Sequence, residues 1–467
     1  MSGDEPTEAA RVHDEGYVPT GVDGLVGYVD SLDEPVVSLQ WVDDGRRRTT
    51  LAVGVTPVPA GVPATDTPAV DVRSVAVGST VARPVPVSAV ESVRPVADAQ
   101  TATAALPTDS RSRVATLRGL AEHAPELVHV AFVLPMLDHD SPVVVEALSC
   151  LTDVAHERAD DCVAAVPLVL SLVSGPDEGE SGGENEVRVG ALSFLAALAA
   201  ARPADVVPHL DRVCDWLASS EAAAVAAAVR CVSSVAGAEP TAVVDHGDEL
   251  TALLGADDGE IRMHAAYALG RVAVVSPETV RPHVARLAVV VGDRSARTPT
   301  RLNAACAVGR VAGEWPDAVV DHLETFVETL AAADARLRAN AAGVVGDVAV
   351  SHPVDVRHHL EPLVARLDDE DGTVRVNAST AVARVAREFP DAAVDHVGRL
   401  VGALDDEESV VRETACWTLG SLQGRARTAR AALEGVHADD GDEQVRDRAR
   451  WALDELPVDA DGTGVGD

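Results

Sequence analysis

The sequence predicts an all-α protein, a right-handed α-solenoid of helical pairs, preceded by a small N-terminal segment that is β-rich or partly disordered. Two observations predict this fold. Prolines recur at spacings of 37 to 39 residues from residue 203 onward, and a constant period of this length is typical of repeat architectures. Within each period the apolar residues follow helical spacing, which indicates amphipathic helices stacked on one another.

The period is marked by three aligned columns of residues. Histidine follows each proline by six residues, and arginine precedes the proline by fifteen residues in five of six units. The prolines are Pro203, Pro240, Pro277, Pro316, Pro353 and Pro390; the histidines are His209, His246, His283, His322, His359 and His396; the arginines are Arg188, Arg262, Arg301, Arg338 and Arg375. Agreement at three separate columns excludes coincidence.

Each unit is predicted to hold two helices. After the proline, apolar residues occur at offsets of 3, 7, 10 and 14, as in Val319, Leu323, Phe326 and Leu330, and they form one helical stripe. The proline suits the first turn of that helix, because its missing N–H would have no partner there. Strings such as LRANAAGVVGDVA then predict a second helix, whose small alanine and glycine residues permit close packing.

These residues resemble HEAT repeats, in which an apolar helix, an acidic turn and Val-Arg precede a second helix of the form NAAxALG. Asp369 with Arg375, and Asp406 with Arg412, reproduce the family's aspartate and arginine six residues apart. The resemblance covers about Ser110 to Leu456. It implies an array of turn-bridging Asp–Arg pairs, a concave surface lined by the second helices, and a function as a binding scaffold.

The remaining segments have different patterns. We predict a disordered acidic N-terminus at 1–15, a small β-rich module with its linker at 16–105, the solenoid at 106–456 with a flexible acidic loop at 174–186, and a disordered acidic tail at 457–467. Alternating residues in VVSLQWV and RRRTTLAVGV, separated by a short turn, predict a β-hairpin in the module. The alternative for 16–105 is a mostly disordered arm.

The composition indicates a salt-rich cytoplasm. The net charge is −37, with 75 acidic residues, and all 38 basic residues are arginine. Such an acidic, lysine-free surface resembles that of haloarchaeal proteins, because molar salt screens the repulsion between carboxylates. The N-terminus has no apolar core, which argues against a signal peptide, and no apolar run is long enough to span a membrane. We expect a cytoplasmic protein.

Neither catalytic, cofactor nor metal sites are expected. A Walker phosphate loop needs lysine, and the sequence has none of the motifs GxGxxG, GxSxG and HExxH. The histidine column cannot assemble a zinc site, because equivalent residues on stacked helices lie roughly 8–10 Å apart whereas zinc ligands converge within about 2.1 Å of the metal. We expect these histidines to pack beside the apolar stripe against the next repeat.

Polar residues along one face of the second helices are the candidate binding site. They are Arg271, Asn303, Arg310, Asn340, Asn377 and Arg384, and we call them the second-helix face. Their donors suit carboxylates, phosphates or a peptide backbone. The alternative is a solvated face on which these residues pair with acids and neighbouring loops.

We therefore predict a non-catalytic scaffold that binds a partner protein or peptide in its concave groove. The alternative is a nucleic-acid-associated HEAT protein, such as a chromosome-organising subunit or a glycosylase-like DNA binder. Arginines interspersed with acids, and an aromatic content of 3%, argue against that alternative. The sequence identifies neither the partner nor the oligomeric state.

The acidic composition predicts that stability rises with salt. Between 0.1 and 2 M KCl the melting temperature should increase, because the excess carboxylates repel one another in dilute buffer and are screened at molar ionic strength. Thermal melts followed by circular dichroism measure this. A melting temperature that stays constant or falls would contradict the halophilic interpretation and leave the fold prediction intact.

Overall fold

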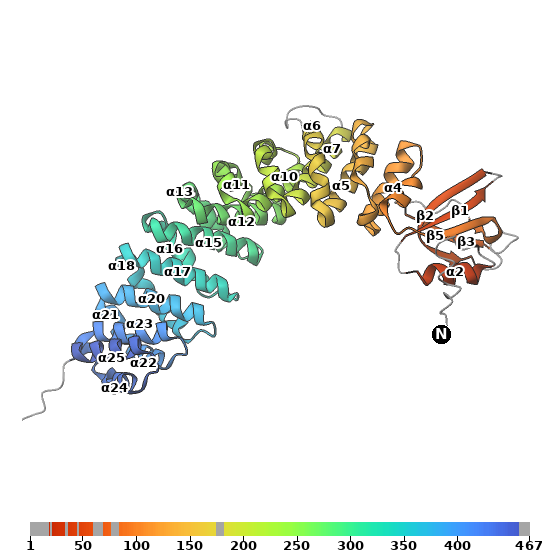
Figure 1. Ribbon diagram of the computed structural model, residues 1–467. Helices are drawn as coiled ribbons and strands as arrows, with labels where there is room; N and C mark the ends of the chain where they lie inside the picture. Colours follow the sequence, from red (N-terminus) through yellow and green to blue (C-terminus); the bar gives the residue numbers. More distant parts are fainter. Residues whose placement is uncertain are drawn as a thin grey trace, which may run out of the picture. The chain divides into compact units, whose positions relative to one another are not determined.

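The structure is a computed structural model that describes residues 18, 21–32, 36–43, 46–58, 69–75, 84–173 and 182–456 (Figure 1). The predicted disordered termini at 1–15 and 457–467, and residues 174–181 of the predicted acidic loop, lie outside the described residues. The chain divides into two compact units, Met1–Val235 and Ala236–Asp467, which are taken in turn.

The first unit begins with a β-rich segment, as predicted. Its elements are α2 (Val22–Asp30), β1 (Val37–Asp43), β2 (Arg46–Pro57), β3 (Ala69–Ser74), β4 (Val85–Pro86), the 3-10 helix η1 (Val87–Ala89), β5 (Val90–Pro95) and α3 (Ala99–Ala104). The strands form one antiparallel sheet in the order β4-β3-β2-β1-β5. The predicted hairpin is confirmed, since Val37 pairs with Ala52 and Asp43 with Arg46.

Two short helices in this segment were not predicted. Helix α2 packs Leu25, which is fully buried, into a core shared with Leu39 and Val70 of the sheet. Helix α3 lies where we expected a linker, and the side chain of Asp98 caps it by accepting a hydrogen bond from the Thr101 N–H at 2.7 Å. Both are shorter than ten residues, so their stability depends on packing and capping that periodicity does not reveal.

The rest of the first unit is helical. Its elements are α4 (Ser110–His123), η2 (Pro125–Leu127), η3 (Val130–Phe132), η4 (Leu134–Asp138), α5 (Ser141–Cys162), η5 (Val163–Ala165), α6 (Val166–Leu172), α7 (Gly182–Ala201), α8 (Pro203–Val206), η6 (Val207–His209), α9 (Leu210–Cys214), η7 (Asp215–Ala218) and α10 (Ala222–Ala238). Residues 182–186, predicted as part of the acidic loop, open helix α7 instead. Glu184 in its first turn lies 3.9 Å from Arg188, and the Arg188 guanidinium lies over the Trp216 ring. A carboxylate is favoured at a helix N-terminus, which explains the earlier start.

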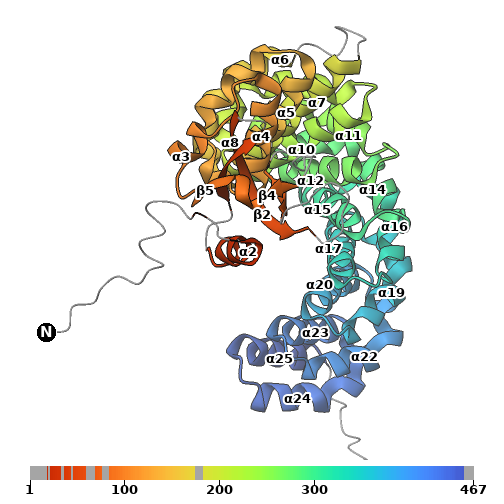
Figure 2. The ribbon, with the colours of Figure 1, turned by 90° about the vertical axis from the view of Figure 1, so that its right-hand side faces the viewer.

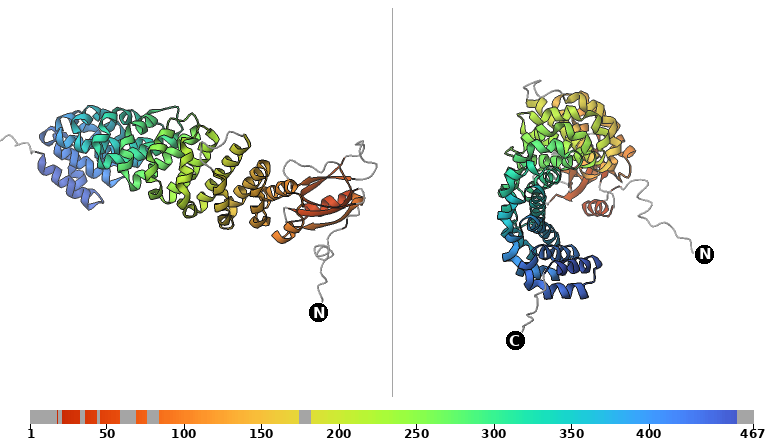
Figure 3. Two further views of the ribbon diagram at one scale, coloured as in Figure 1. Left: turned by 90° about the horizontal axis from the view of Figure 1, so that it is seen from above. Right: turned by 90° about the vertical axis from the view of Figure 1, so that its left-hand side faces the viewer.

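The second unit repeats a regular pattern of helices. Its elements are η8 (Pro240–His246), α11 (Gly247–Leu253), α12 (Gly259–Val275), α13 (Pro277–Val280), η9 (Arg281–His283), α14 (Val284–Gly292), α15 (Thr298–Glu314), η10 (Pro316–Ala318), η11 (Val320–His322), α16 (Leu323–Thr329), α17 (Ala335–Ser351), α18 (Pro353–Val356), η12 (Arg357–His359), α19 (Leu360–Val364), η13 (Ala365–Asp368), α20 (Gly372–Glu388), α21 (Pro390–Ala393), η14 (Val394–His396), α22 (Val397–Gly402), η15 (Ala403–Asp405), α23 (Ser409–Ser421), η16 (Gln423–Ala429), α24 (Arg430–Asp439) and α25 (Glu443–Glu455). The short first-helix segments form one layer of this unit and the long second helices the other (Figures 1 and 3).

The predicted apolar columns form the core of this unit. Twelve positions before the proline, an alanine is fully buried in each of four consecutive second helices, and eight positions before it a leucine or valine is fully buried. These residues are Ala265, Ala304, Ala341 and Ala378, and Leu269, Val308, Val345 and Val382. Because alanine adds almost no bulk, adjacent second helices approach closely and each repeat buries its apolar surface against the next.

The first helix of each repeat is not continuous, contrary to our prediction. In most repeats it is a single turn after the proline, then a 3-10 turn ending at the column histidine, then a second helical segment; in the Pro240 repeat one 3-10 helix, η8, runs from the proline to the histidine. The histidine backbone lies in the sparsely populated bridge region, as at His283 (φ −100°, ψ 2°) and His359 (φ −109°, ψ 19°). This break directs the half-buried imidazole to the preceding repeat, where His283 lies 3.2 Å from Asp248 and His396 lies 3.3 Å from Glu361.

A second set of contacts joins the turns between helices. Arg338 pairs with Asp369, Arg375 with Asp406, and Arg412 with Asp440, each through two hydrogen bonds of 2.7–3.1 Å. We call these three pairs the turn ladder. The resemblance implied a ladder of turn-bridging Asp–Arg pairs, and these three pairs form one. Each arginine pairs with the aspartate of the following repeat.

The arginines of the turn ladder also fix their own turns. Arg375 Nη1 donates to the carbonyls of Asp369 and Glu370, at 2.9 and 3.3 Å. The Asp369 carboxylate meanwhile accepts from Arg338 and from the Asp371 N–H. One guanidinium therefore holds two successive turns, and these fork-shaped contacts require arginine rather than lysine.

Breaking one pair of the turn ladder should destabilise the protein. The side chains of Arg338 and Asp369 are 8% and 3% exposed, and removing one partner of a buried pair costs about 3 kcal/mol or more. Asp369→Ala should therefore lower the free energy of unfolding by this amount in urea melts. Asp368→Ala is the control, since the Asp368 side chain is 73% exposed. Equal effects of the two variants would contradict the assigned pairing.

The turn ladder also predicts acid sensitivity. Burial alone would raise the pKa of Asp369, but the hydrogen bonds from Arg338 outweigh this effect and hold the pKa below its usual range. The hydrogen bonds from Arg412 likewise lower the pKa of Asp440. A carboxyl group whose pKa is lower in the folded protein than in the unfolded chain stabilises the fold at a pH above its unfolded pKa of about 3.9. That stabilisation is lost as the pH falls to the pKa of the folded protein. In 2 M KCl, the free energy of unfolding should fall between pH 5 and pH 2. Asp440→Asn should show a flatter pH dependence, and an unchanged slope would contradict this role.

Candidate functional site

The second-helix face spans α12, α15, α17 and α20, which follow one another side by side in the second unit (Figures 1 and 2). Its residues recur 13 and 6 positions before the column proline. The buried apolar columns occupy neighbouring positions of the same helices, so the regular stacking of the core places these polar residues in register.

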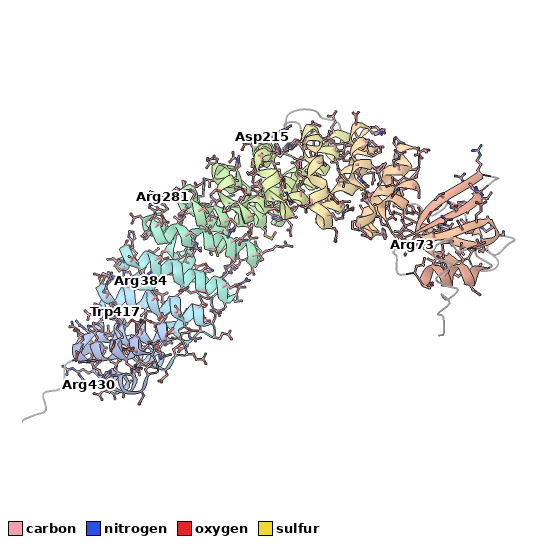
Figure 4. All side chains as sticks on the ribbon, in the orientation of Figure 1. Arg73, Asp215, Arg281, Arg384, Trp417 and Arg430 are labelled. Atoms are coloured by element: carbon pink, nitrogen blue, oxygen red, sulfur yellow. The ribbon has the colours of Figure 1, made fainter. Side chains whose placement is uncertain are left out.

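Two of these side chains bind the neighbouring repeat. Arg384 Nη1 donates to Asp347 Oδ1 at 2.9 Å, and both side chains are about one-third exposed. Arg384 is labelled in Figure 4. Asn377 Nδ2 donates to the Ala339 carbonyl at 2.8 Å. Both contacts join α20 to α17. Some of the N–H donors that we predicted to bind a partner therefore bind the neighbouring helix instead.

Two asparagines lie around Cys306 on α15 and α17. Asn340 Nδ2 donates to the Arg336 carbonyl of its own helix at 2.8 Å, and Asn340 Oδ1 accepts from the exposed Cys306 thiol at 3.4 Å. The Asn303 side chain is half-buried, and its backbone lies against Gly270 of α12, where an added Cβ would come within 3.3 Å of the Asn303 carbonyl oxygen. Here a glycine permits the close approach of two second helices.

The two remaining arginines differ from each other. Arg271 Nη2 donates to the Gly237 carbonyl at 3.3 Å, and its buried Nε has no hydrogen-bond partner within the described residues. Arg310 is exposed, and among the described residues its side chain makes neither a hydrogen bond nor an ion pair. The face therefore has an available guanidinium at Arg310, and its internally bonded side chains are Arg271, Asn340, Asn377 and Arg384.

Two further residues share this face but were not among the predicted site residues. Asp347 is the partner of Arg384, but it occupies the position that holds arginine in the adjacent repeats. Tyr267 is 38% exposed on α12, a large exposure for an aromatic side chain in a chain with few of them. The column six positions before the proline alternates between Arg310, Asp347 and Arg384, but only the structure shows that Asp347 pairs with Arg384.

Other chemistry is limited in the described part of the chain. Within it, no group of three or more His, Cys, Asp or Glu residues could hold a metal ion, and no helix is long and apolar enough to cross a membrane. Five cysteines are buried, namely Cys150, Cys162, Cys214, Cys231 and Cys416, while Cys306 is exposed. Burial raises the pKa of the Cys162 thiol to about 11 and that of Cys231 to about 12.

Comparisons with known proteins agree with this architecture. Residues 360–454 match the family of HEAT repeats. The chain is similar to the crystal structure of an engineered protein, with 23% identity and a TM-score of 0.65 over 76% of this chain and 98% of that one. It is also similar to UNC-45 from Drosophila melanogaster, with 12% identity and a TM-score of 0.53 over 76% of this chain and 57% of UNC-45. No curated protein sequence matches. At these identities the likeness shows the fold alone.

Proposed function

Since the chain has the fold of a HEAT/armadillo-like solenoid, we propose that it is a non-catalytic scaffold that binds a partner protein or peptide on the second-helix face. We further propose that it works in a salt-rich cytoplasm of haloarchaeal type, which the acidic, lysine-free composition supports. The partner-binding residues in this proposal are Arg310 at the centre, with Arg271, Asn303, Asn340, Asn377 and Arg384 around it.

The observation that carries the proposal is the available guanidinium of Arg310. On the second-helix face, Arg384 bonds to a carboxylate and Arg271 to a carbonyl, whereas Arg310 is exposed and bonds to none of the described residues. A guanidinium offers five N–H donors in a fixed plane, which suits a carboxylate or the carbonyls of an extended peptide.

The surroundings of Arg310 also suit a protein partner. Cys306 lies one helical turn before it on α15 and is exposed, and Tyr267 is exposed on the neighbouring α12. Tyrosine and arginine are enriched where proteins meet, because each combines apolar contact area with hydrogen bonding. An exposed tyrosine and an available arginine on neighbouring second helices therefore support a site for a protein or peptide.

The nucleic-acid alternative has weaker support. Binding to a phosphate backbone needs several cations that are not already neutralised, yet Arg384 on this face is paired with Asp347. Single-strand binding also relies on aromatic stacking, and only 3% of the residues are aromatic. Nuclease treatment of captured material separates the two functions.

Replacing Arg310 and Arg384 with serine should separate binding from stability. The Arg384–Asp347 pair is partly exposed, and such pairs contribute about 0–1 kcal/mol, so the melting temperature of Arg310→Ser/Arg384→Ser should stay near that of the wild type. Partner capture in molar KCl, quantified by mass spectrometry, should fall sharply because the central donors are lost.

A matched control is Arg286→Ser, which removes an exposed arginine from the first-helix layer. This variant should retain both stability and partner capture. If the double variant melts much lower but keeps its partners, these arginines stabilise the stack and the binding surface lies elsewhere. If capture by the wild type is abolished by nuclease, the nucleic-acid alternative replaces the proposal.

A further inference from the structure

Arg301 has no aspartate at the position that completes the pairs of the turn ladder. Arg301 belongs to the arginine column, but the residue that supplies the aspartate in later repeats is here Ala332. The backbone shows that Ala332 occupies the same place as Asp369. Its N–H donates to the carbonyl three residues earlier at 2.9 Å, as that of Asp369 does at 3.1 Å, and its carbonyl accepts from the arginine six residues later.

Three consecutive positions of this turn carry alanine. Later turns have Asp368, Asp369 and Glu370, and then Asp405, Asp406 and Glu407, whereas this turn has Ala331, Ala332 and Ala333. Alanine also stands in this column at Ala256, but the preceding repeat there carries Val225 in place of arginine. Arg301 is therefore a ladder arginine that has kept its guanidinium and lost its acid.

Only one of the three nitrogens of the Arg301 guanidinium makes a hydrogen bond with the described residues. Its Nε donates to the Val291 carbonyl at 2.8 Å, and its two terminal nitrogens bond to none of the described residues. The side chain is half-buried, so its position is restricted. In the turn ladder the corresponding arginines bind both oxygens of an aspartate. Those arginines use Nε and one terminal nitrogen, whereas in Arg301 the Nε is engaged and the two terminal nitrogens form the edge that has no such partner.

A cavity of about 280 Å³ lies at this position. Arg294 and Arg301 contribute its cations, Glu328 is the acid among its lining residues, and the three alanines of the turn line it as well. A cavity of about 450 Å³ between two later turns is lined by Arg375 and six acidic residues. The two cavities lie at similar places in the repeat and have opposite charge, in a protein whose net charge is −37.

We propose that the cavity at Arg301 binds the carboxylate of a ligand, which takes the place of the aspartate that Ala332 replaces. Arg301 binds the two oxygens through its terminal nitrogens, and Arg294, which is exposed, adds a second cation at the rim. Glu328 is also exposed and partly opposes binding, so the site selects a single carboxylate. The site lies in the turns and does not depend on the function proposed for the second-helix face.

The test restores the missing acid with Ala332→Asp. The measurement is an NMR titration of protein labelled with [¹⁵N]arginine, at constant chloride concentration. The Arg301 Nε–Hε resonance is the one that disappears in the variant Arg301→Lys. The probes are sodium acetate and the blocked amino acid N-acetyl-glutamate N-methylamide, with acetamide and the glutamine analogue as uncharged controls. The wild type should show a saturable shift with the carboxylate probes alone. In Ala332→Asp the binding should weaken at least tenfold, because its own carboxylate occupies the cavity.

The outcomes separate the sources of the carboxylate. Equal affinity for acetate and the blocked glutamate indicates a free carboxylate ion, whereas tighter binding of the blocked glutamate indicates an acidic side chain of a peptide. Ala332→Asp should also raise the melting temperature without any ligand. The proposal is overturned if neither carboxylate probe gives a saturable shift, if the uncharged probes act equally, or if Ala332→Asp leaves the shift unchanged.

Discussion

Each helical pair of this protein can bury its apolar residues only against the next pair, so the register in which neighbouring pairs stack determines every other feature of the second unit. The alanine and valine columns supply most of the stabilisation, because burial of apolar surface is the main favourable contribution to folding. They are almost uniform along the stack, however, and uniform small side chains specify register weakly. The directional contacts at the turns and at the histidines provide that specification. Arg375 binding Asp406, and His396 lying beside Glu361, each have one geometry in which they form.

The repeat architecture was predictable because proline, histidine and arginine recur at fixed positions and the apolar stripes match helical spacing. The break in the first helix was not, because the sequence around His359 and His396 satisfies the same apolar spacing as a continuous helix. The break depends on the backbone angles of one residue, and the spacing of apolar residues carries no information about those angles. Helix α2 was missed for a similar reason, since it is stabilised by the burial of Leu25 against a sheet whose position the sequence does not specify.

The candidate site was predictable in its positions and not in its bonding. Column spacing placed Asn377 and Arg384 on one face, but only the structure shows that Asn377 bonds to the Ala339 carbonyl and Arg384 to Asp347. The same limit applied to the turns. The six-residue spacing of Asp369 and Arg375 implied a ladder of turn-bridging pairs but did not identify which residues pair. The actual partners are 31 residues apart, because stacking brings each arginine nearer to the next turn than to the side chain of its own.

The distribution of thiols gives the second-helix face a natural attachment point for a reporter group. Cys306 is exposed on α15 between Asn303 and Arg310, while the other five cysteines are buried. Burial also raises the pKa of the Cys416 thiol to about 12, so near neutral pH that side chain stays in its unreactive protonated form. A maleimide fluorophore would therefore attach to the folded wild-type protein mainly at Cys306, without removal of any other cysteine. Its emission would respond directly to whatever occupies the surface beside Arg310.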